Sequence, residues 1–593
     1  MRTQRSVRRR GAGAITAVLS GVGLAAVGLS AAAPGAAVAA TAPACTMRGT
    51  AGIPAGGGSR VDVLDSLAQI QPRRPRAGAS GAVLCQGRGA FESFQIEVTA
   101  GAAGLSGVSM TAGALTGPAG STIAAGNVGL YREDYAVIRT ATDAELTGAL
   151  PRTSAGACTG DCRFPDALIP DVDTLVGEKR AAFPFTVPAG ENRAVWADVL
   201  VPAGQRPGTY AGWIAITSAA GALASVPVKL TVVNASIPAT STSHSAFFLT
   251  LGGGRVPSAA AYAQYAELGL ENRISVVPNS ALPGDPSAML GRQLTGTDPE
   301  VRLRGAALTD FPMQVGWSSS EVSSYRSMFT RLGVAAKAWI YCDEVSPASC
   351  ASDSSTAVGA WPGLPLLAIA APLSGWPDPK TTVAPRVLAS RLKGIVPLVQ
   401  FIEPIAGYNP YSTLGSRMPA LSAWRSGGAG RQVWSYTSCM SGGCDSPYTG
   451  SSVYNGWPSY GIDQVATEQR ASGWQAFRYG IDGALYWGVN DDMSIWTDPY
   501  DSGMNGDGTL FYPYDAARVG GHTPVPVESI RLKRIRDGRQ DLELLKVATS
   551  AGQGVEASNI AASVFPQMVS SAPSAANFDG ARGQLMALFG PVT

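Results

Sequence analysis

The chain has 593 residues, of which 15% are charged, and its 45 Lys and Arg against 43 Asp and Glu give a net charge of +2. This near-neutral balance, without a basic run beyond the N-terminus, argues against nucleic-acid binding. The only histidines, His244 and His522, lie in no Gly-x-Ser-x-Gly or His-Glu-x-x-His pattern, which excludes a histidine-rich metal site and disfavours a Ser-His-Asp triad.

The N-terminus has the features of an export signal over residues 1–40. Arginines between positions 2 and 10 form a basic head, residues 14–29 are uncharged, and a stretch of small residues ends at Ala40. No later stretch stays apolar for the roughly 18 residues that a membrane span needs. We therefore expect a secreted, extracellular protein without a membrane span after the signal is removed.

The eight cysteines of the chain fall into four local pairs. These are Cys45 with Cys85, Cys158 with Cys162, Cys342 with Cys350, and Cys439 with Cys444. Disulfides are expected in an exported chain, and zinc is disfavoured because no histidine lies at ligand spacing.

Residues 41–236 are predicted to form a β-sandwich domain. Apolar and polar residues alternate in segments 90–98, 194–201, 210–216 and 226–233, as they do in half-buried strands. Turn signals such as Pro202-Ala-Gly separate these segments. Short strands at this spacing are typical of a sandwich.

Residues 237–550 are predicted to form a (β/α)8 barrel, after a boundary rich in Ser, Thr and Pro. The candidate strands are 246–251, 273–277, 312–315, 338–341, 365–370, 396–402, 432–436 and 483–487. They are short, continuous apolar runs, as buried parallel strands are. A charged helix is expected over 528–547, and residues 551–593 are predicted to be a helical tail.

Acidic and aromatic residues follow the last barrel strands, whose carboxyl ends line the active site of such a fold. Asp343 and Glu344 end one apolar run abruptly, and a pair of carboxyl groups suits acid/base attack on a glycosidic bond. The candidate substrate-binding residues at later strand ends are Glu403, Tyr436, Trp487, Asn490 and Asp491. Carboxylates bind sugar hydroxyls and aromatic rings stack on sugar faces, so a glycan or glycoconjugate substrate is expected.

At these residues the chain resembles glycoside hydrolase family 123 and the broader group called domain of unknown function 4091. The likeness is carried by Tyr341-Cys-Asp343-Glu344, Trp434-Ser-Tyr436-Thr437, the segment from Asp482 to Asn490, Gly506-Asp-Gly508 with Tyr512-Pro513, and Ser529 to Gly538 with Asp541. Trp196-Ala-Asp-Val and Pro207-Gly-Thr-Tyr210 resemble the N-terminal region of that family. The resemblance covers most of residues 90 to 550.

The resemblance implies a retaining β-N-acetylgalactosaminidase that works by substrate assistance, without a cofactor or a metal. The 2-acetamido oxygen of the substrate would attack the anomeric carbon and form an oxazolinium ion. Glu344 would be the general acid/base, and Asp343 would orient and stabilise the acetamido group. Neighbouring residues of a strand point to opposite faces, so we expect the strand to end or bulge at Cys342, and a Cys342–Cys350 disulfide could impose that turn.

Two alternatives remain open at this point. In the first, Glu344 is the acid and Glu403 the nucleophile of a glycosidase whose substrate has no 2-acetamido group, with the carboxyl groups about 5–5.5 Å apart. In the second, the chain is a secreted glycan-binding protein without turnover.

Overall fold

The structure is a computed structural model that describes residues 45, 47, 49, 51–142, 161–343, 347–369, 390–403, 416–438, 458–501, 503–568 and 573–590. From Ala42 onward the chain belongs to one compact unit. No helix among the described residues is long and apolar enough to cross a membrane. The predicted signal, residues 1–40, lies outside the described residues.

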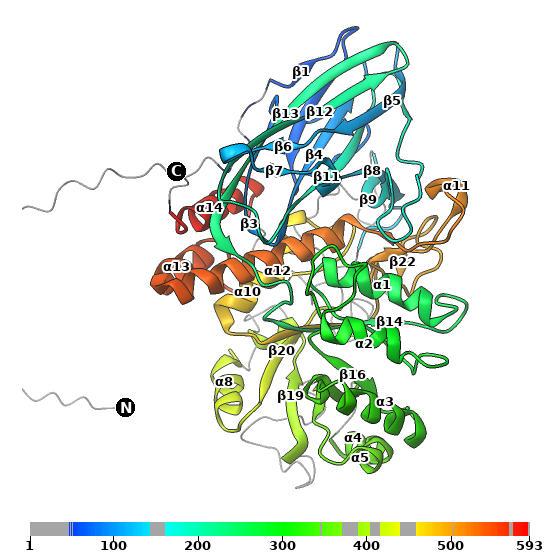
Figure 1. Cartoon of the computed structure of the whole chain (residues 1–593), viewed down its shortest axis with the longest axis vertical. Coiled ribbons are helices and arrows are strands. Elements are labelled where there is room, and N and C mark those ends of the chain that lie inside the picture. Colours follow the sequence, from blue (N-terminus) through cyan, green and yellow to red (C-terminus); the bar gives the residue numbers. More distant parts are fainter. Residues whose placement is uncertain are drawn as a thin grey trace, which may run out of the picture. The chain divides into compact units, whose positions relative to one another are not determined.

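Two β-sheets make up the N-terminal region (blue to cyan-green in Figure 1). The six-stranded sheet has the order β1 (Ile53–Pro54), β2 (Arg60–Asp65), β4 (Ala90–Thr99), β11 (Asn192–Val201), β8 (Val128–Val137) and β9 (Arg163–Pro170). The second sheet has the order β10 (Phe185–Val187), β5 (Leu105–Ala112), β12 (Gly208–Ser218), β13 (Gly221–Ser236) and β3 (Ala82–Arg88); β6 (Leu115–Thr116) also pairs with β12, and β7 (Thr122–Ile123) pairs with β6. Alternate side chains of both sheets, such as Phe94 of β4 and Leu230 of β13, belong to one apolar cluster.

Eight parallel strands follow and form a nearly closed barrel, as expected for a TIM-like fold. They are β14 (His244–Leu249), β15 (Val276–Pro278), β16 (Phe311–Gln314), β17 (Ala338–Cys342), β18 (Leu366–Ile369), β19 (Leu392–Val396), β20 (Gln432–Tyr436) and β21 (Gly483–Tyr486). Hydrogen bonds join them in the order β15-β14-β21-β20-β19-β18-β17-β16. Within the described residues, only β15 and β16 lack the ladder that would close the ring.

The helices lie mostly in the connections after these strands. They are α1 (Ala259–Glu271), α2 (Ser287–Thr295), α3 (Ser319–Arg331), α4 (Pro347–Asp353), α5 (Ser355–Ala360), α7 (Val399–Ile402), α8 (Met418–Ser426) and α10 (Ala466–Tyr479). Beyond β21 come α11 (Ala516–Val519), α12 (Ile530–Ala548), α13 (Gly554–Val564) and α14 (Ala575–Ala587), with the short strands β22 (Tyr500–Asp501), β23 (Met504–Asn505), β24 (Phe511–Tyr512) and β25 (Val527–Glu528).

The sixth barrel strand lies earlier in the chain than its sequence pattern predicted. The strand is Leu392–Val396, and the apolar run after it forms the short helix Val399–Ile402. Pro397 has no amide hydrogen for the ladder, so the strand ends before it. Lys393 and Gly394 hid the true strand, because they interrupt its apolar pattern. Glu403 therefore follows a helix and not a strand.

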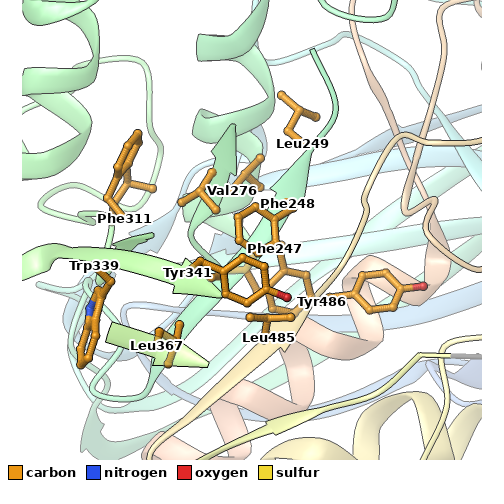
Figure 2. Close-up of a cluster of buried hydrophobic side chains, with 14 of the residues drawn as sticks. Phe247, Phe248, Leu249, Val276, Phe311, Trp339, Tyr341, Leu367, Leu485 and Tyr486 are labelled. Atoms are coloured by element: carbon orange, nitrogen blue, oxygen red, sulfur yellow. The ribbon is translucent and has the colours of Figure 1, made fainter. Parts of the chain in front are cut away.

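Large apolar side chains of the barrel strands pack together in one cluster (Figure 2). The ring of Phe248 on β14 lies 4.9 Å from that of Tyr341 on β17, and Phe247 lies 5.9 Å from Tyr486 on β21. The first contact links the strand that precedes Asp343 to the first strand of the barrel, and the second links the first strand to the last.

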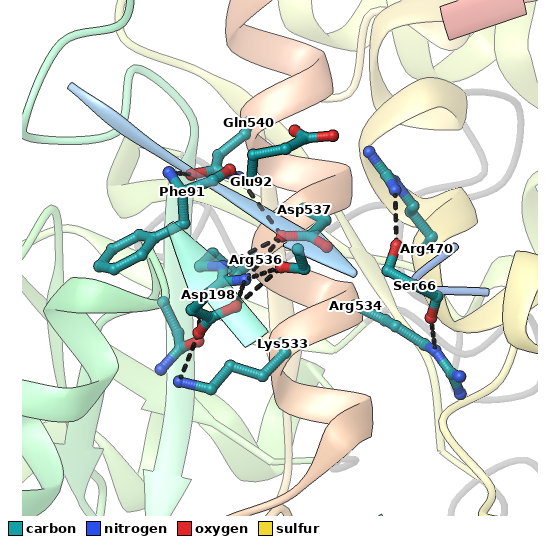
Figure 3. A network of polar contacts seen from close by, with 12 residues as sticks. Ser66, Phe91, Glu92, Asp198, Arg470, Lys533, Arg534, Arg536, Asp537 and Gln540 are labelled. Carbon is teal, nitrogen blue, oxygen red and sulfur yellow. Dashed lines mark hydrogen bonds and ion pairs between the residues drawn. The ribbon is translucent and has the colours of Figure 1, made fainter. Parts of the chain in front are cut away.

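Helix α12 is buried along most of its length although it is rich in charge (Figure 3). The predicted charged face is not solvated: some of its cations pair with carboxylates of the N-terminal sheet, and others, such as Arg534, donate to backbone carbonyls. Arg531 pairs with Asp166 of β9 at 2.8 Å, and Arg536 pairs with Asp198 of β11 at 2.8 Å. Such pairs are retained in the interior only where each charge has its partner.

The C-terminal segment contains α13 and α14, and α14 is docked on the rest of the chain. Arg582 of α14 donates to Glu92 of β4 at 2.7 Å and to Asp541 of α12 at 3.2 Å. The disulfides Cys45–Cys85 and Cys342–Cys350 are present. Of the other two predicted pairs, Cys158, Cys439 and Cys444 lie outside the described residues.

Candidate active site

Asp343 follows directly on β17, at the carboxyl end of the barrel. The strand ends at Cys342, as the paired-acid interpretation requires, and the Cys342–Cys350 disulfide ties this end to helix α4. The Tyr341 hydroxyl donates to Oδ1 of Asp343 at 3.0 Å. Glu344 lies outside the described residues.

The Asp343 carboxyl is exposed at the strand end, yet the protein around it still removes part of its hydration. This desolvation raises the pKa of Asp343 above its ordinary value, and the hydrogen bond from Tyr341 opposes the rise. A carboxylate in such a setting interacts strongly with a cation that forms beside it.

The side chains of Asn490 and Asp491 form hydrogen bonds with Thr250, which follows the first barrel strand, β14. The Asn490 side chain accepts from the backbone nitrogen of Thr250 at 2.9 Å and donates to its carbonyl at 3.0 Å. Both ends of this amide are therefore engaged, and Asn490 holds Thr250 in place. Asp491 accepts from the Thr250 hydroxyl at 2.7 Å through Oδ1.

The second carboxylate oxygen of Asp491 has no hydrogen-bond partner among the described residues. Desolvation raises the pKa of Asp491, while the bond from Thr250 and the charge of Arg255 oppose the rise. Arg255 donates to the Asp491 carbonyl at 2.8 Å. This second oxygen is itself buried and lies against Gly488.

Trp487 follows β21 and is partly buried. Its indole Nε1 also lacks a hydrogen-bond partner within the described part of the chain. The ring packs against Gly508, where an added Cβ would lie 2.3 Å from a ring carbon. Trp487 thus places a partly buried aromatic ring, with its Nε1 buried, at the end of β21.

Tyr436 ends β20 as expected, but it is only 1% exposed and belongs to the apolar cluster of the barrel. Its ring therefore belongs to the packed interior of the barrel.

Glu403 is held apart from these residues. Its carboxylate accepts from the Tyr479 hydroxyl, at the last turn of α10, and from the Met568 backbone at 2.8 Å. The apolar residues around it, among them Ile402 and Ile481, form an outer cluster separate from the barrel interior. The described contacts do not bring Glu403 to Asp343 or Asp491.

Sequence reasoning missed Thr250, Arg255 and Asn279. Thr250 follows β14, and Asn279, which follows β15, donates to the Thr250 hydroxyl at 3.4 Å. The rule that strand ends line the site applies to the first two strands as well, so that rule could have found them.

No group of His, Cys, Asp and Glu side chains able to hold a metal ion occurs among the described residues. His244 lies at the opposite end of the barrel, where it contacts Asp310 at 2.9 Å and Gln432 at 3.0 Å. The site is thus built from carboxylates, hydroxyls, an amide and an indole.

Residues 448–548 match the family model described as glycoside hydrolase 123, catalytic domain. Among solved structures, the chain is similar to a family 123 glycoside hydrolase from Clostridium perfringens, described in connection with glycolipid glycan hydrolysis, at 12% identity and a TM-score of 0.58. That likeness covers 90% of this chain and 97% of the other, and it concerns the fold. A family 39 glycoside hydrolase from Bacteroides cellulosilyticus WH2 is similar at 9% identity and a TM-score of 0.29, over 70% of this chain and 78% of that one. No curated protein sequence matches the chain.

Proposed function

We propose that this chain, a glycoside hydrolase with a family 123 catalytic domain, removes β-linked N-acetylgalactosamine, or a related N-acetylhexosamine, by substrate-assisted catalysis. The observation that supports this most is the placement of Asp343 at an abrupt strand end, anchored by Tyr341 and by the Cys342–Cys350 disulfide.

In this mechanism no protein group attacks the sugar. The 2-acetamido oxygen attacks the anomeric carbon while Glu344 gives its proton to the departing glycosidic oxygen. Asp343 accepts the amide N–H and stabilises the oxazolinium ion electrostatically. The Glu344 carboxylate then takes a proton from water. The water oxygen attacks the anomeric carbon from the face that the leaving group occupied, which opens the oxazolinium ring and retains the configuration.

Asp491 and Trp487 are assigned to the sugar itself. The Asp491 carboxylate would accept from a hydroxyl, and the Trp487 ring would cover an apolar face of the pyranose. Asn490 serves this pair indirectly, since its amide is committed to Thr250.

The placement of Glu403 disfavours the alternative with a protein nucleophile. A retaining pair needs carboxyl groups about 5–5.5 Å apart, whereas Glu403 is bound to Tyr479 and Met568 in the outer cluster. A thiazoline inhibitor distinguishes the two mechanisms, because it mimics the oxazolinium ion and should inhibit only the substrate-assisted enzyme.

The test of the proposal is hydrolysis of a chromogenic N-acetyl-β-galactosaminide by the purified chain, compared with Glu344→Gln. The amide keeps the shape of the side chain but cannot donate the proton. We expect a loss of about 10²–10⁴-fold on substrates with poor leaving groups and a much smaller loss on activated aryl glycosides. Equal losses on both substrates would contradict the role of Glu344.

We further propose that the two N-terminal sheets form the predicted sandwich and that the protein acts outside the cell. The shared apolar cluster of the sheets supports the first point. The two disulfides support the second, because they persist in oxidising compartments.

A further inference from the structure

A single arginine of α12 holds two loops near the barrel mouth. Arg531 donates to the carbonyls of Tyr460 at 3.0 Å, Gly506 at 2.7 Å and Thr509 at 2.6 Å. Its remaining bonds go to Asp166 of β9, at 3.0 Å from Nε and 2.8 Å from Nη2. Both side chains are 1% exposed. The Asp166 carboxylate of the N-terminal sheet thus orients the Arg531 guanidinium, which donates to the backbone of the two loops.

The loop 506–509, which Arg531 holds, is also hydrogen-bonded to the residues that follow β21. The carbonyl of Gly508 accepts from the Asp491 backbone at 3.1 Å, and the Thr509 hydroxyl accepts from the Asp492 backbone at 2.8 Å. The Trp487 ring lies directly against Gly508. The residues assigned to the sugar therefore rest on the loop that Arg531 holds.

The residues Gly506-Asp507-Gly508 fit closely between Arg531 and the end of β21. Both glycines have positive φ, +80° and +66°, and an added Cβ would lie 2.8 Å from the Arg531 guanidinium or 2.3 Å from the Trp487 ring. Between them, Asp507 accepts from the Tyr486 hydroxyl at 3.0 Å. The loop thus contacts the arginine on one side and the strand end on the other.

We propose that Asp166 and Arg531 are positioning residues for sugar binding, acting through the 506–509 loop on Trp487 and Asp491. The N-terminal sheet would then govern how the barrel holds its substrate. The inference rests on the proposed function in that it takes Trp487 and Asp491 to contact the sugar.

The chain offers a matched control on the same helix. Asp198 of β11 pairs with Arg536 of α12 at 2.8 Å and is fully buried, like Asp166. The other hydrogen bonds of Asp198 come from Ser93 and Trp196 and not from the mouth loops. Asp166→Asn leaves Arg531 without a carboxylate, whereas Asp198→Asn removes one of the two carboxylates that pair with Arg536, which keeps Asp537 at 3.0 Å. Only the first variant loosens the 506–509 loop.

The experiment compares both variants in the full chain, by steady-state kinetics on the chromogenic N-acetyl-β-galactosaminide and by thermal unfolding. Both should melt at lower temperature. Asp166→Asn should raise KM about tenfold with a smaller change in kcat and an unchanged pH profile, because the acid and base are untouched. Asp198→Asn should keep KM within about twofold of the wild type. Equal KM changes in both variants, or a wild-type KM in Asp166→Asn, would overturn the proposal.

Two further measurements keep the inference testable. If Asp166→Asn does not fold, Tyr512→Phe removes the 2.7 Å hydrogen bond to Asp166 and retains the ring; a KM at the wild-type value would then count against the role. If the wild type does not hydrolyse the substrate, the proposed function fails, and amide hydrogen exchange decides the positioning separately. Faster exchange over 486–492 in Asp166→Asn alone supports it, and equal exchange in both variants refutes it.

Discussion

Asp343 stands between two opposing influences, because desolvation raises its pKa while catalysis needs it as an anion. We expect Asp343→Asn to lower kcat on N-acetyl sugars more than it raises KM, since the charge matters mainly in the transition state. In the wild type, activity should fall as pH drops through this raised pKa. Steady-state kinetics across pH test both points. Near wild-type turnover by Asp343→Asn would rule out its role in orienting the acetamido group.

Glu133 of β8 is a fully buried acid whose two oxygens have no hydrogen-bond partner among the described residues. Desolvation raises its pKa to about 8; the charge of Arg534 opposes this rise, and Glu97 adds to it. The folded chain therefore keeps a proton that the unfolded chain loses near pH 4.5, so stability should fall as pH rises from about 4.5 to about 8.

We expect Glu133→Gln to remove this slope and to stabilise the fold at pH 7 by about 3 kcal/mol, at about 1.4 kcal/mol per pKa unit. Denaturant unfolding at several pH values measures the effect. Glu178 provides a control of opposite sign, because bonds from Thr523 and His522 lower its pKa to about 2. The stabilisation of the fold by ionised Glu178 is present above about pH 4.5 and disappears as pH falls towards 2. An unchanged slope in Glu133→Gln would show that Glu133 does not retain the proton.

At the level of elements, the Cys342–Cys350 disulfide connects the end of β17 to α4 around the acid pair. Replacing both cysteines by alanine should reduce kcat strongly, because the strand end is then free to extend or shift. The matched control is Cys45→Ala with Cys85→Ala, which removes the disulfide of the N-terminal region. This control should lower the melting temperature and leave kcat unchanged. Similar kcat losses in both double variants would contradict a specific role for the first disulfide.

Across the whole molecule, α14 is held to distant parts of the chain by one buried cation. Arg582→Ala would leave Glu92 and Asp541 without their shared partner, and we expect a loss of about 3–5 kcal/mol of unfolding free energy. The additional change Glu92→Gln should recover part of this loss, because it removes one uncompensated buried charge. Denaturant unfolding of the single and double variants tests this. A wild-type stability for Arg582→Ala would show that the C-terminal segment contributes little to the folded unit.

Features that depend on near neighbours in the chain could be predicted from the sequence. The apolar run before Asp343 is a strand because its residues are buried together, and its end at Cys342 matches the change from apolar to acidic side chains. The Cys342–Cys350 disulfide and the helix over Ile530–Ala548 follow from spacing of the same local kind. The barrel, and the position of Asp343 at its carboxyl end, could therefore be predicted from the sequence.

Only the tertiary structure decided which polar groups already have a hydrogen-bond partner. Asn490 is occupied by Thr250, 240 residues away, and Glu403 by Met568, 165 residues away, while one oxygen of Asp491 stays without a partner among the described residues. The burial of the charged face of α12 likewise depends on the carboxylates of β9 and β11. A hydrogen bond or ion pair satisfies a side chain whatever the distance along the chain, so local patterns identify candidate groups, but the fold determines which of them are already bound.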